Sequence, residues 1–175
     1  MTPAEQLKPD LLLHALEDLD LDLLASRGIR GIILDVDNTL TRWRSHEVLP
    51  QKAAWIERAR QRFALCLLSN TIFGRRLRTL GESLGIPYLG FWGLSRKPSP
   101  RGTRAALRAL GVEAAHACIV GDQVFADILA GKRCGLFTVL VDPVDPSSEF
   151  ISTRLVRFFE RPLRRAWAES EEGSS

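Results

Sequence analysis

Apolar runs alternate with helical patterns along most of the chain. Short continuous apolar runs are typical of parallel strands that are covered on both faces, and segments with apolar residues at helical spacing separate them. The expected strands are 31–35, 64–69, 86–91, 117–121 and 136–141, and the expected helices are 51–63, 72–84, 100–110 and 123–133. Because strands and helices alternate, the sequence predicts an α/β fold with a three-layer, Rossmann-like parallel sheet.

The two ends of the chain depart from this alternation. Residues 9–24 carry leucines at helical spacing with acids between them, which predicts an N-terminal helical lead-in over 1–27. A C-terminal helix is expected over 146–168, and a disordered polar tail over 169–175. The residues between these ends, 28–145, form the predicted main domain.

The intervals between the expected strands leave no room for a lid. About 34 residues separate Asp35 from Ser69, and the interval from Asn70 to Lys97 is filled by one expected helix and one expected strand. Neither interval can hold an inserted cap domain. A ligand at this edge of the sheet would therefore be met by loops, in an open site.

Polar residues of compatible chemistry follow the carboxyl ends of four expected strands. In chain order they are Asp35 and Asp37, Ser69 and Asn70, Lys97, and Asp122 with Asp127. Taken singly, each is explained by a turn, a helix cap or a solvated surface charge. Their placement at successive strand ends favours one shared site, because ligands of open α/β sheets bind at that edge.

This set suits phosphoryl transfer, which needs a nucleophile, a cation, donors to phosphate oxygens and a proton donor. Asp35 would attack phosphorus and form an aspartyl-phosphate, while Asp37 would exchange protons with the leaving group and with water. Lys97 would offset the acids as a point charge. The predicted catalytic residues are Asp35, Asp37, Ser69 and Lys97, and the predicted substrate-binding residues are Thr39, Asn70 and Arg96.

Three acids beside one phosphate would repel it, so a divalent cation is expected among them. Mg²⁺ suits such a site, because it prefers oxygen ligands and commonly binds one or two carboxylates together with substrate phosphate. The predicted ligands are the carboxylates of Asp35 and Asp122 and the carbonyl of Asp37. Asp127 is expected to support these ligands or to contact a metal-bound water.

The order of these motifs resembles that of the haloacid dehalogenase superfamily of phosphatases. The matching segments are 35–41 (DVDNTLT), 69–70 (SN), 97–98 (KP) and 121–127 (GDQVFAD). The resemblance implies the haloacid dehalogenase fold without a cap domain and a magnesium-dependent phosphomonoesterase activity. It also implies Asp35 as nucleophile, Asp37 as acid and base, Ser69 and Lys97 as phosphate contacts, and metal at Asp35 and Asp122.

Further segments are similar to subfamily IIIA, the YqeG-like branch, over roughly residues 7–165. They are 28–31 (GIRG), 84–87 (LGIP), 121–123 (GDQ) and 149–151 (EFI). This branch is similar to the mitochondrial and plastid phosphatidylglycerophosphatases, which implies a phospholipid head group as substrate. Ala126 departs from the branch, which often has Thr there; the change removes a hydroxyl but no charge.

The net charge of +3 is concentrated near the C-terminus. The segment from Phe150 to Trp167 contains five arginines and one acid, Glu160. On a helical wheel the arginines lie opposite Phe, Leu and Trp, a pattern typical of a helix in a membrane interface. The alternative is that the apolar face packs on the domain, and both could hold in successive halves, since Pro162 is expected to kink or end the helix near Arg161.

Three functions remain open from the sequence. The leading hypothesis is dephosphorylation of phosphatidylglycerophosphate at an anionic membrane surface; the alternatives are a soluble phosphatase and a nucleic-acid-end phosphatase or binding protein. The last is disfavoured because an apolar face opposes the arginines. The three cysteines form no C-x-x-C pair, and no secretory signal or membrane-spanning run is visible, which predicts a cytoplasmic protein. The basic amphipathic helix adds the expectation that the protein is held peripherally on the inner face of the membrane.

Overall fold

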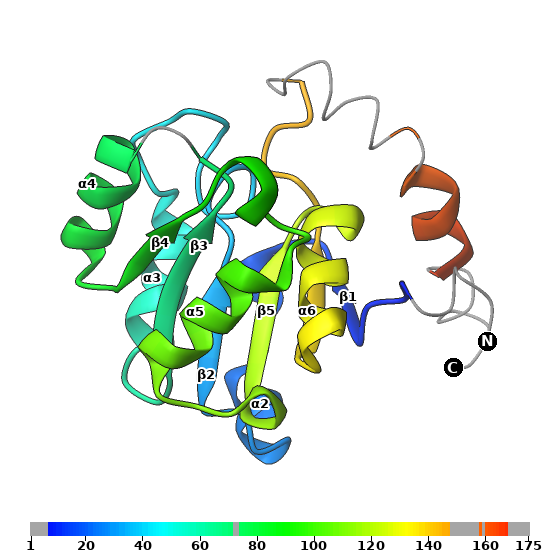
Figure 1. Ribbon diagram of the computed structural model, residues 1–175, viewed down its shortest axis with the longest axis horizontal. Helices are drawn as coiled ribbons and strands as arrows, with labels where there is room; N and C mark the ends of the chain where they lie inside the picture. Colours follow the sequence, from blue (N-terminus) through cyan, green and yellow to red (C-terminus); the bar gives the residue numbers. More distant parts are fainter. Residues whose placement is uncertain (1–6, 72–73, 148–157, 159, 168–175) are drawn as a thin grey trace.

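A six-stranded parallel sheet forms the centre of the computed structural model, which describes residues 7–71, 74–147, 158 and 160–167 (Figure 1). The strand order is β1-β6-β5-β2-β3-β4. The strands are β1 (Leu11–Leu13), β2 (Gly31–Leu34), β3 (Ala64–Ser69), β4 (Tyr88–Gly90), β5 (Ala117–Gly121) and β6 (Phe137–Val141). All neighbouring pairs are parallel, and the strands expected at 31–35, 64–69, 86–91, 117–121 and 136–141 are confirmed.

Helices cover both faces of the sheet. The α-helices are α2 (Leu21–Ser26), α3 (Pro50–Ala59), α4 (Gly74–Leu84), α5 (Pro100–Leu110) and α6 (Leu129–Cys134). Shorter turns are η1 (Leu16–Asp18), η2 (Gly93–Ser95), η3 (Ala114–His116) and η4 (Val124–Ile128), the last with π-helical geometry. Each interval between strands of the main domain holds helices and loops, and the described residues include no inserted cap domain.

Alternate residues of each central strand contribute to different cores. Ile32 and Leu34 of β2 pack with α3 residues such as Trp55, whereas Ile33 packs with α5 residues such as Ala106. In Figure 1, α5 and α6 lie in front of the sheet and α3 lies behind it. Burial on both faces explains why the strands appear in the sequence as continuous apolar runs. The three-layer prediction is therefore confirmed.

The helical interpretation of residues 9–24 is wrong at Leu11–Leu13, which form the edge strand β1. Strand β1 pairs with β6, and Asp10 fixes this pairing through its carboxylate, which accepts hydrogen bonds from the backbone N and the Oγ1 of Thr138 at 2.8 and 2.7 Å. This tertiary contact outweighs the helical spacing of the leucines. The helical expectation holds further along, in η1 and α2.

The last described segment, 158 and 160–167, is helical, so Pro162 does not end the helix. Its Leu163 and Trp167 pack on the domain in a cluster with Val124 and Ile128. For these residues the packing alternative is supported. Most of the rest of the helix predicted over 146–168, and all of the polar tail predicted over 169–175, lie outside the described residues.

The helical-wheel prediction for the C-terminal helix is wrong for Arg164, which it places on the exposed basic face, and for Phe158, which it places on the buried apolar face. Arg164 faces the domain together with Leu163 and Trp167, whereas Phe158 is 64% exposed. The buried stripe follows the spacing Glu160, Leu163, Arg164 and Trp167, because a helix presents residues three and four apart to the same surface. None of the helices in the described part of the chain is long and apolar enough to cross a membrane.

Candidate active site

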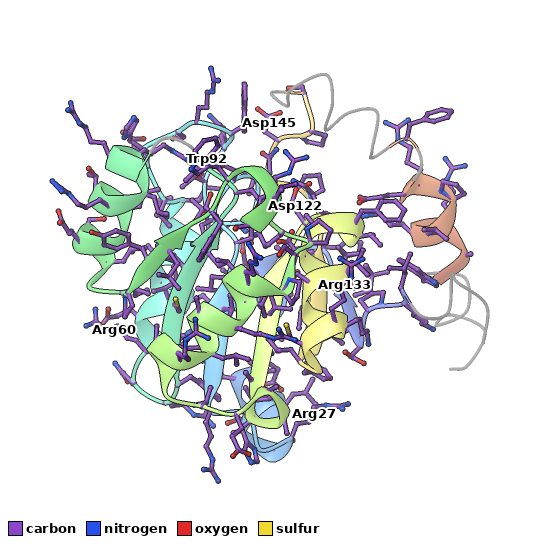
Figure 2. All side chains as sticks on the ribbon, viewed as in Figure 1. Arg27, Arg60, Trp92, Asp122, Arg133 and Asp145 are labelled. Carbon is purple, nitrogen blue, oxygen red and sulfur yellow. The ribbon has the colours of Figure 1, made fainter. Side chains whose placement is uncertain are left out.

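The predicted site residues meet beyond the carboxyl ends of the three adjacent strands β5, β2 and β3. Asp35 follows β2, Ser69 ends β3 and Asp122 follows β5. Neighbouring parallel strands end at the same edge, and the backbone N of Asp35 donates to the carbonyl of Val120 at 2.9 Å. Figure 2 shows Asp122 at this edge of the sheet. All three polar residues are buried.

Three carboxylates form the centre of the site. Asp35, Asp122 and Asp127 each offer an oxygen, and these oxygens lie within 4.8 Å of one another. The π-helical turn η4 brings Asp127 back toward the strand end, where its Oδ2 accepts a hydrogen bond from the backbone N of Gln123 at 3.1 Å. A Cβ atom at Gly121 would lie 2.2 Å from Asp127 Cγ, so glycine is required for this approach.

Lys97 lies inside the carboxylate cluster and is fully buried. Its Nζ donates to Asp35 Oδ1 at 2.5 Å, to Asp127 Oδ1 at 2.6 Å and to the carbonyl of Leu68 at 2.9 Å. Asn70 fixes the lysine backbone with both ends of its amide: Nδ2 donates to the Lys97 carbonyl at 3.0 Å, and Oδ1 accepts from the Lys97 N at 2.7 Å. Asn70, predicted to bind substrate, is thus engaged in positioning Lys97.

Burial and charge act against each other in this cluster. Burial raises the pKa of Asp35 well above its ordinary value; Lys97 opposes the rise, and Asp127 and Asp122 add to it. For Lys97, burial would lower the pKa, but the carboxylates of Asp127 and Asp35 outweigh it and raise that pKa. Three acids with one lysine leave excess negative charge among oxygen donors, so these residues fit a divalent cation such as Mg²⁺.

Thr39 and Asp37 take different places around the cluster. The Thr39 hydroxyl lies 3.3 Å from both Asp35 Oδ2 and Asp122 Oδ1, between the two carboxylates. The Asp37 side chain, 25% exposed, instead forms an ion pair of 2.9 Å with Arg76 Nη1 and accepts from the backbone N of Arg44 at 3.3 Å. Asp37 therefore lies at the mouth of the site.

Arg96 is exposed and is not one of the buried residues of the cluster, although it directly precedes Lys97. Its backbone carbonyl accepts a hydrogen bond from the backbone N of Ser99 at 2.8 Å, at the start of α5. The structure therefore brings together Asp35, Ser69, Asn70, Lys97, Asp122, Asp127 and Thr39 and leaves Asp37 and Arg96 at the rim.

Sequence reasoning missed Arg76, which holds Asp37. Besides the ion pair, Arg76 donates from Nε to the Ser45 carbonyl at 2.6 Å and from Nη2 to Thr41 Oγ1 at 2.8 Å. One signal could have found it: Arg76 stands four residues before Leu80, on the buried stripe of α4. Residue type alone does not distinguish Arg76 from the exposed arginines of the same helix.

The C-terminal helix also reaches the site, which the sequence did not predict. Arg164 Nη2 donates to the backbone carbonyl of Asp122 at 2.6 Å, and its Nη1 lies 2.9 Å from Asp142 Oδ1. One turn earlier, Glu160 Oε1 accepts from the backbone N of Phe125 at 3.0 Å. These two side chains hold both ends of the segment 122–125, which carries a carboxylate of the cluster.

The raised pKa of Asp35 has a consequence for stability. A carboxyl whose pKa is higher in the folded than in the unfolded chain loses stability as pH rises above the ordinary value of 3.8 and through the folded pKa. Without metal at pH 8, Asp35→Asn should therefore raise the thermal unfolding midpoint. Calorimetry in the presence of a chelator measures this.

The difference between Asp35→Asn and wild type should grow from about pH 4 upward and then level off. Asp22→Asn is the matched control, because the Asp22 side chain is 84% exposed. A less stable Asp35→Asn protein at pH 8 would contradict this picture of the cluster.

The contact of Arg164 predicts an effect on metal affinity. Arg164→Ala frees the Asp122 carbonyl from its guanidinium partner, so the affinity for Mg²⁺ should fall about 10-fold, as for other residues that orient metal ligands. Isothermal titration of Mg²⁺ into the protein measures this. Arg165→Ala is the control, because the neighbouring Arg165 is exposed; equal affinities of the two variants would disprove the role of Arg164.

Known proteins resemble this chain along most of its length. The family model described as mitochondrial PGP phosphatase matches residues 1–145. The probable phosphatase YqeG of Bacillus subtilis (strain 168) is 32% identical over 158 residues, covering 90% of each chain. The chloroplastic/mitochondrial phosphatidylglycerophosphate phosphatase 1 of Arabidopsis thaliana is 29% identical over 169 residues, covering 91% of this chain but 47% of that protein.

Solved structures share the fold. An uncharacterized protein from Listeria monocytogenes serotype 4b has a TM-score of 0.53 at 18% identity, covering 74% of this chain and 99% of that one. The magnesium-bound HAD-hydrolase YfnB from Bacillus subtilis has a TM-score of 0.53 at 16% identity, covering 70% and 89%. Because the family model matches residues 1–145 and YqeG is 32% identical over 90% of each chain, the chain belongs to the mitochondrial PGP phosphatase family, within the haloacid dehalogenase superfamily of phosphatases, and the solved structures agree in fold.

Proposed function

We propose that this phosphatase is a magnesium-dependent phosphomonoester hydrolase that converts phosphatidylglycerophosphate to phosphatidylglycerol. The observation that carries the proposal is the buried cluster in which Lys97 bridges Asp35 and Asp127, with Asp122 beside them. Relatives named as phosphatidylglycerophosphate phosphatases support the choice of substrate. The proposal places the reaction at an anionic membrane surface, with the protein held peripherally on the cytoplasmic face.

In the first step, Asp35 acts as nucleophile. A carboxylate oxygen of Asp35 forms a bond to phosphorus, the bond between phosphorus and the ester oxygen breaks, and an aspartyl-phosphate remains on the protein. Asp37 gives its proton to the leaving oxygen, which becomes the hydroxyl of phosphatidylglycerol. The position of Asp37 at the mouth of the site, held by Arg76, suits a leaving group that approaches from outside.

In the second step, water removes the phosphoryl group. Asp37, now ionised, takes a proton from water, and the water oxygen attacks phosphorus. The bond between phosphorus and the Asp35 oxygen breaks, inorganic phosphate leaves, and Asp35 is again a carboxylate. Lys97 stabilises the phosphoryl oxygens in both steps, because its ammonium lies against the attacking carboxyl group. Ser69, at the end of β3, is proposed to donate a hydrogen bond to a phosphoryl oxygen.

The cation is proposed to bind between Asp35 and Asp122, with the Asp37 carbonyl as a further ligand. Bound Mg²⁺ would offset the charge between these carboxylates and the phosphate. Asp127 is assigned a supporting role, since its Oδ1 already accepts from Lys97 and its Oδ2 from the Gln123 backbone. Thr39, whose hydroxyl lies between Asp35 and Asp122, is proposed to hold their relative positions and to contact substrate.

The decisive assay measures phosphate release from phosphatidylglycerophosphate in mixed detergent micelles. Wild type should turn over the lipid with Mg²⁺ and lose activity with a chelator, and Asp35→Asn should lower the rate by at least about 10³-fold, because it removes the nucleophile. Asp22→Asn, an exposed aspartate far from the rim, is the matched control.

Two other results would decide against the lipid substrate. Rapid turnover of a soluble phosphomonoester without turnover of the lipid would indicate a phosphatase for soluble substrates. Preferential release of phosphate from nucleic-acid ends would indicate the third function considered from the sequence. In either case the roles of Asp35 and Asp37 would stand, because every phosphomonoester needs a nucleophile for phosphorus and a proton for its leaving oxygen.

A further inference from the structure

The loop between β4 and α5 exposes large apolar side chains at the catalytic edge of the sheet. Trp92 is 72% exposed and Leu94 is 96% exposed; among the described residues, Phe158 is the other exposed large hydrophobic residue. Figure 2 shows Trp92 at the end of the molecule where the strands have their carboxyl ends. The segment from Phe91 to Ser95 contains no charged residue, and Gly93, with φ of +60°, forms the turn between the two side chains.

This apolar tip, Trp92–Leu94, is directly connected to the buried cluster. Lys97 follows it by three residues, and the Asn70 amide holds the Lys97 backbone through two hydrogen bonds of 2.7 and 3.0 Å. Arg101 Nη1 lies 3.4 Å from Ser95 Oγ, which joins the tip to α5. A surface that takes up the apolar tip would therefore be held against the rim, beside the phosphate site.

The loops at the carboxyl edge of the sheet that follow β2 and β4 expose mainly positive charge. The loops that follow β2 and β4 expose Arg42, Arg44 and Arg96, against one exposed acid, Glu47. Trp43 lies beside them, with the Arg44 guanidinium 4.4 Å from its ring. Arginine next to an exposed tryptophan and leucine complements a surface with an apolar interior and anionic head groups. A purely apolar protein surface would leave these arginines desolvated without partners.

We infer that the apolar tip inserts into the interface of an anionic phospholipid bilayer and holds the catalytic rim against it. The inference rests on the proposed function, because it assigns the surface through which the lipid substrate is reached. Tryptophan suits this position, since its amphipathic ring favours the level of the head groups. Among the described residues no inserted domain covers this edge, and the partly exposed Asp37 marks the mouth of the site at the same edge of the sheet as the tip.

The C-terminal helix is the competing membrane contact. Its Leu163 and Trp167 pack on the domain, and Arg164 is bonded to the Asp122 loop, so these side chains are already engaged. Phe158 and Arg161 are exposed on that helix. Phe158 therefore offers a matched control: it is a large exposed aromatic residue on a basic segment, but it does not belong to the loop that carries Lys97.

The test compares the double variant Trp92→Ser/Leu94→Ser with Phe158→Ser in sedimentation with vesicles of equal parts phosphatidylcholine and phosphatidylglycerol. Removing two inserted side chains should weaken binding by at least about 10-fold. Phe158→Ser should bind as wild type does. Both variants should keep the thermal midpoint of wild type, because the replaced side chains are exposed.

Each other outcome overturns the inference. The apolar tip is excluded as the docking element if the double variant binds vesicles as wild type does. It is also excluded if Phe158→Ser loses binding instead, or if wild type does not bind vesicles. Phosphatidylglycerophosphate with short, water-soluble acyl chains separates this failure from failure of the proposed function. If wild type hydrolyses that lipid but the double variant binds vesicles normally, only the docking inference fails; if wild type hydrolyses neither form, the proposed substrate fails.

Discussion

The contact of the Lys97 ammonium with Asp35 and Asp127 is the interaction on which the site depends. Three carboxylates buried at one edge of a sheet repel one another, and a single lysine placed among them reduces that cost. Asn70 in turn fixes the lysine backbone, so residues far apart in the sequence become one unit. The remaining negative charge suits the cluster to a divalent cation, which would in turn offset the repulsion between these acids and a phosphoryl group.

Parallel strand order imposes this arrangement. Because β5, β2 and β3 are adjacent and parallel, their carboxyl ends deliver Asp122, Asp35 and Ser69 to one place. The rim around them is then formed by loops, and the C-terminal helix adds contacts to one of these loops through Arg164. The described residues include no inserted domain above this rim, so the substrate is met there by loops.

Most of the fold and the clustering of the buried polar residues could be predicted from the sequence. Continuous apolar runs marked the central strands, and the polar residues directly behind them marked the cluster from Asp35 to Asp127. Contacts between side chains of different helices and strands were harder to predict from the sequence. The strand at Leu11–Leu13 depends on Asp10 meeting Thr138, and the Arg76 and Arg164 contacts depend on where each guanidinium reaches. Composition cannot distinguish such arginines from solvated ones.

The central claim is that Asp35 carries the phosphoryl group. Its most direct test is to mix the protein with phosphatidylglycerophosphate and Mg²⁺, quench it in acid during turnover, reduce it with borohydride and sequence the peptides by mass spectrometry. Borohydride reduces an aspartyl-phosphate to homoserine, so homoserine is expected at position 35. Unmodified Asp35 in protein quenched during turnover, with the modification at another residue, would contradict it.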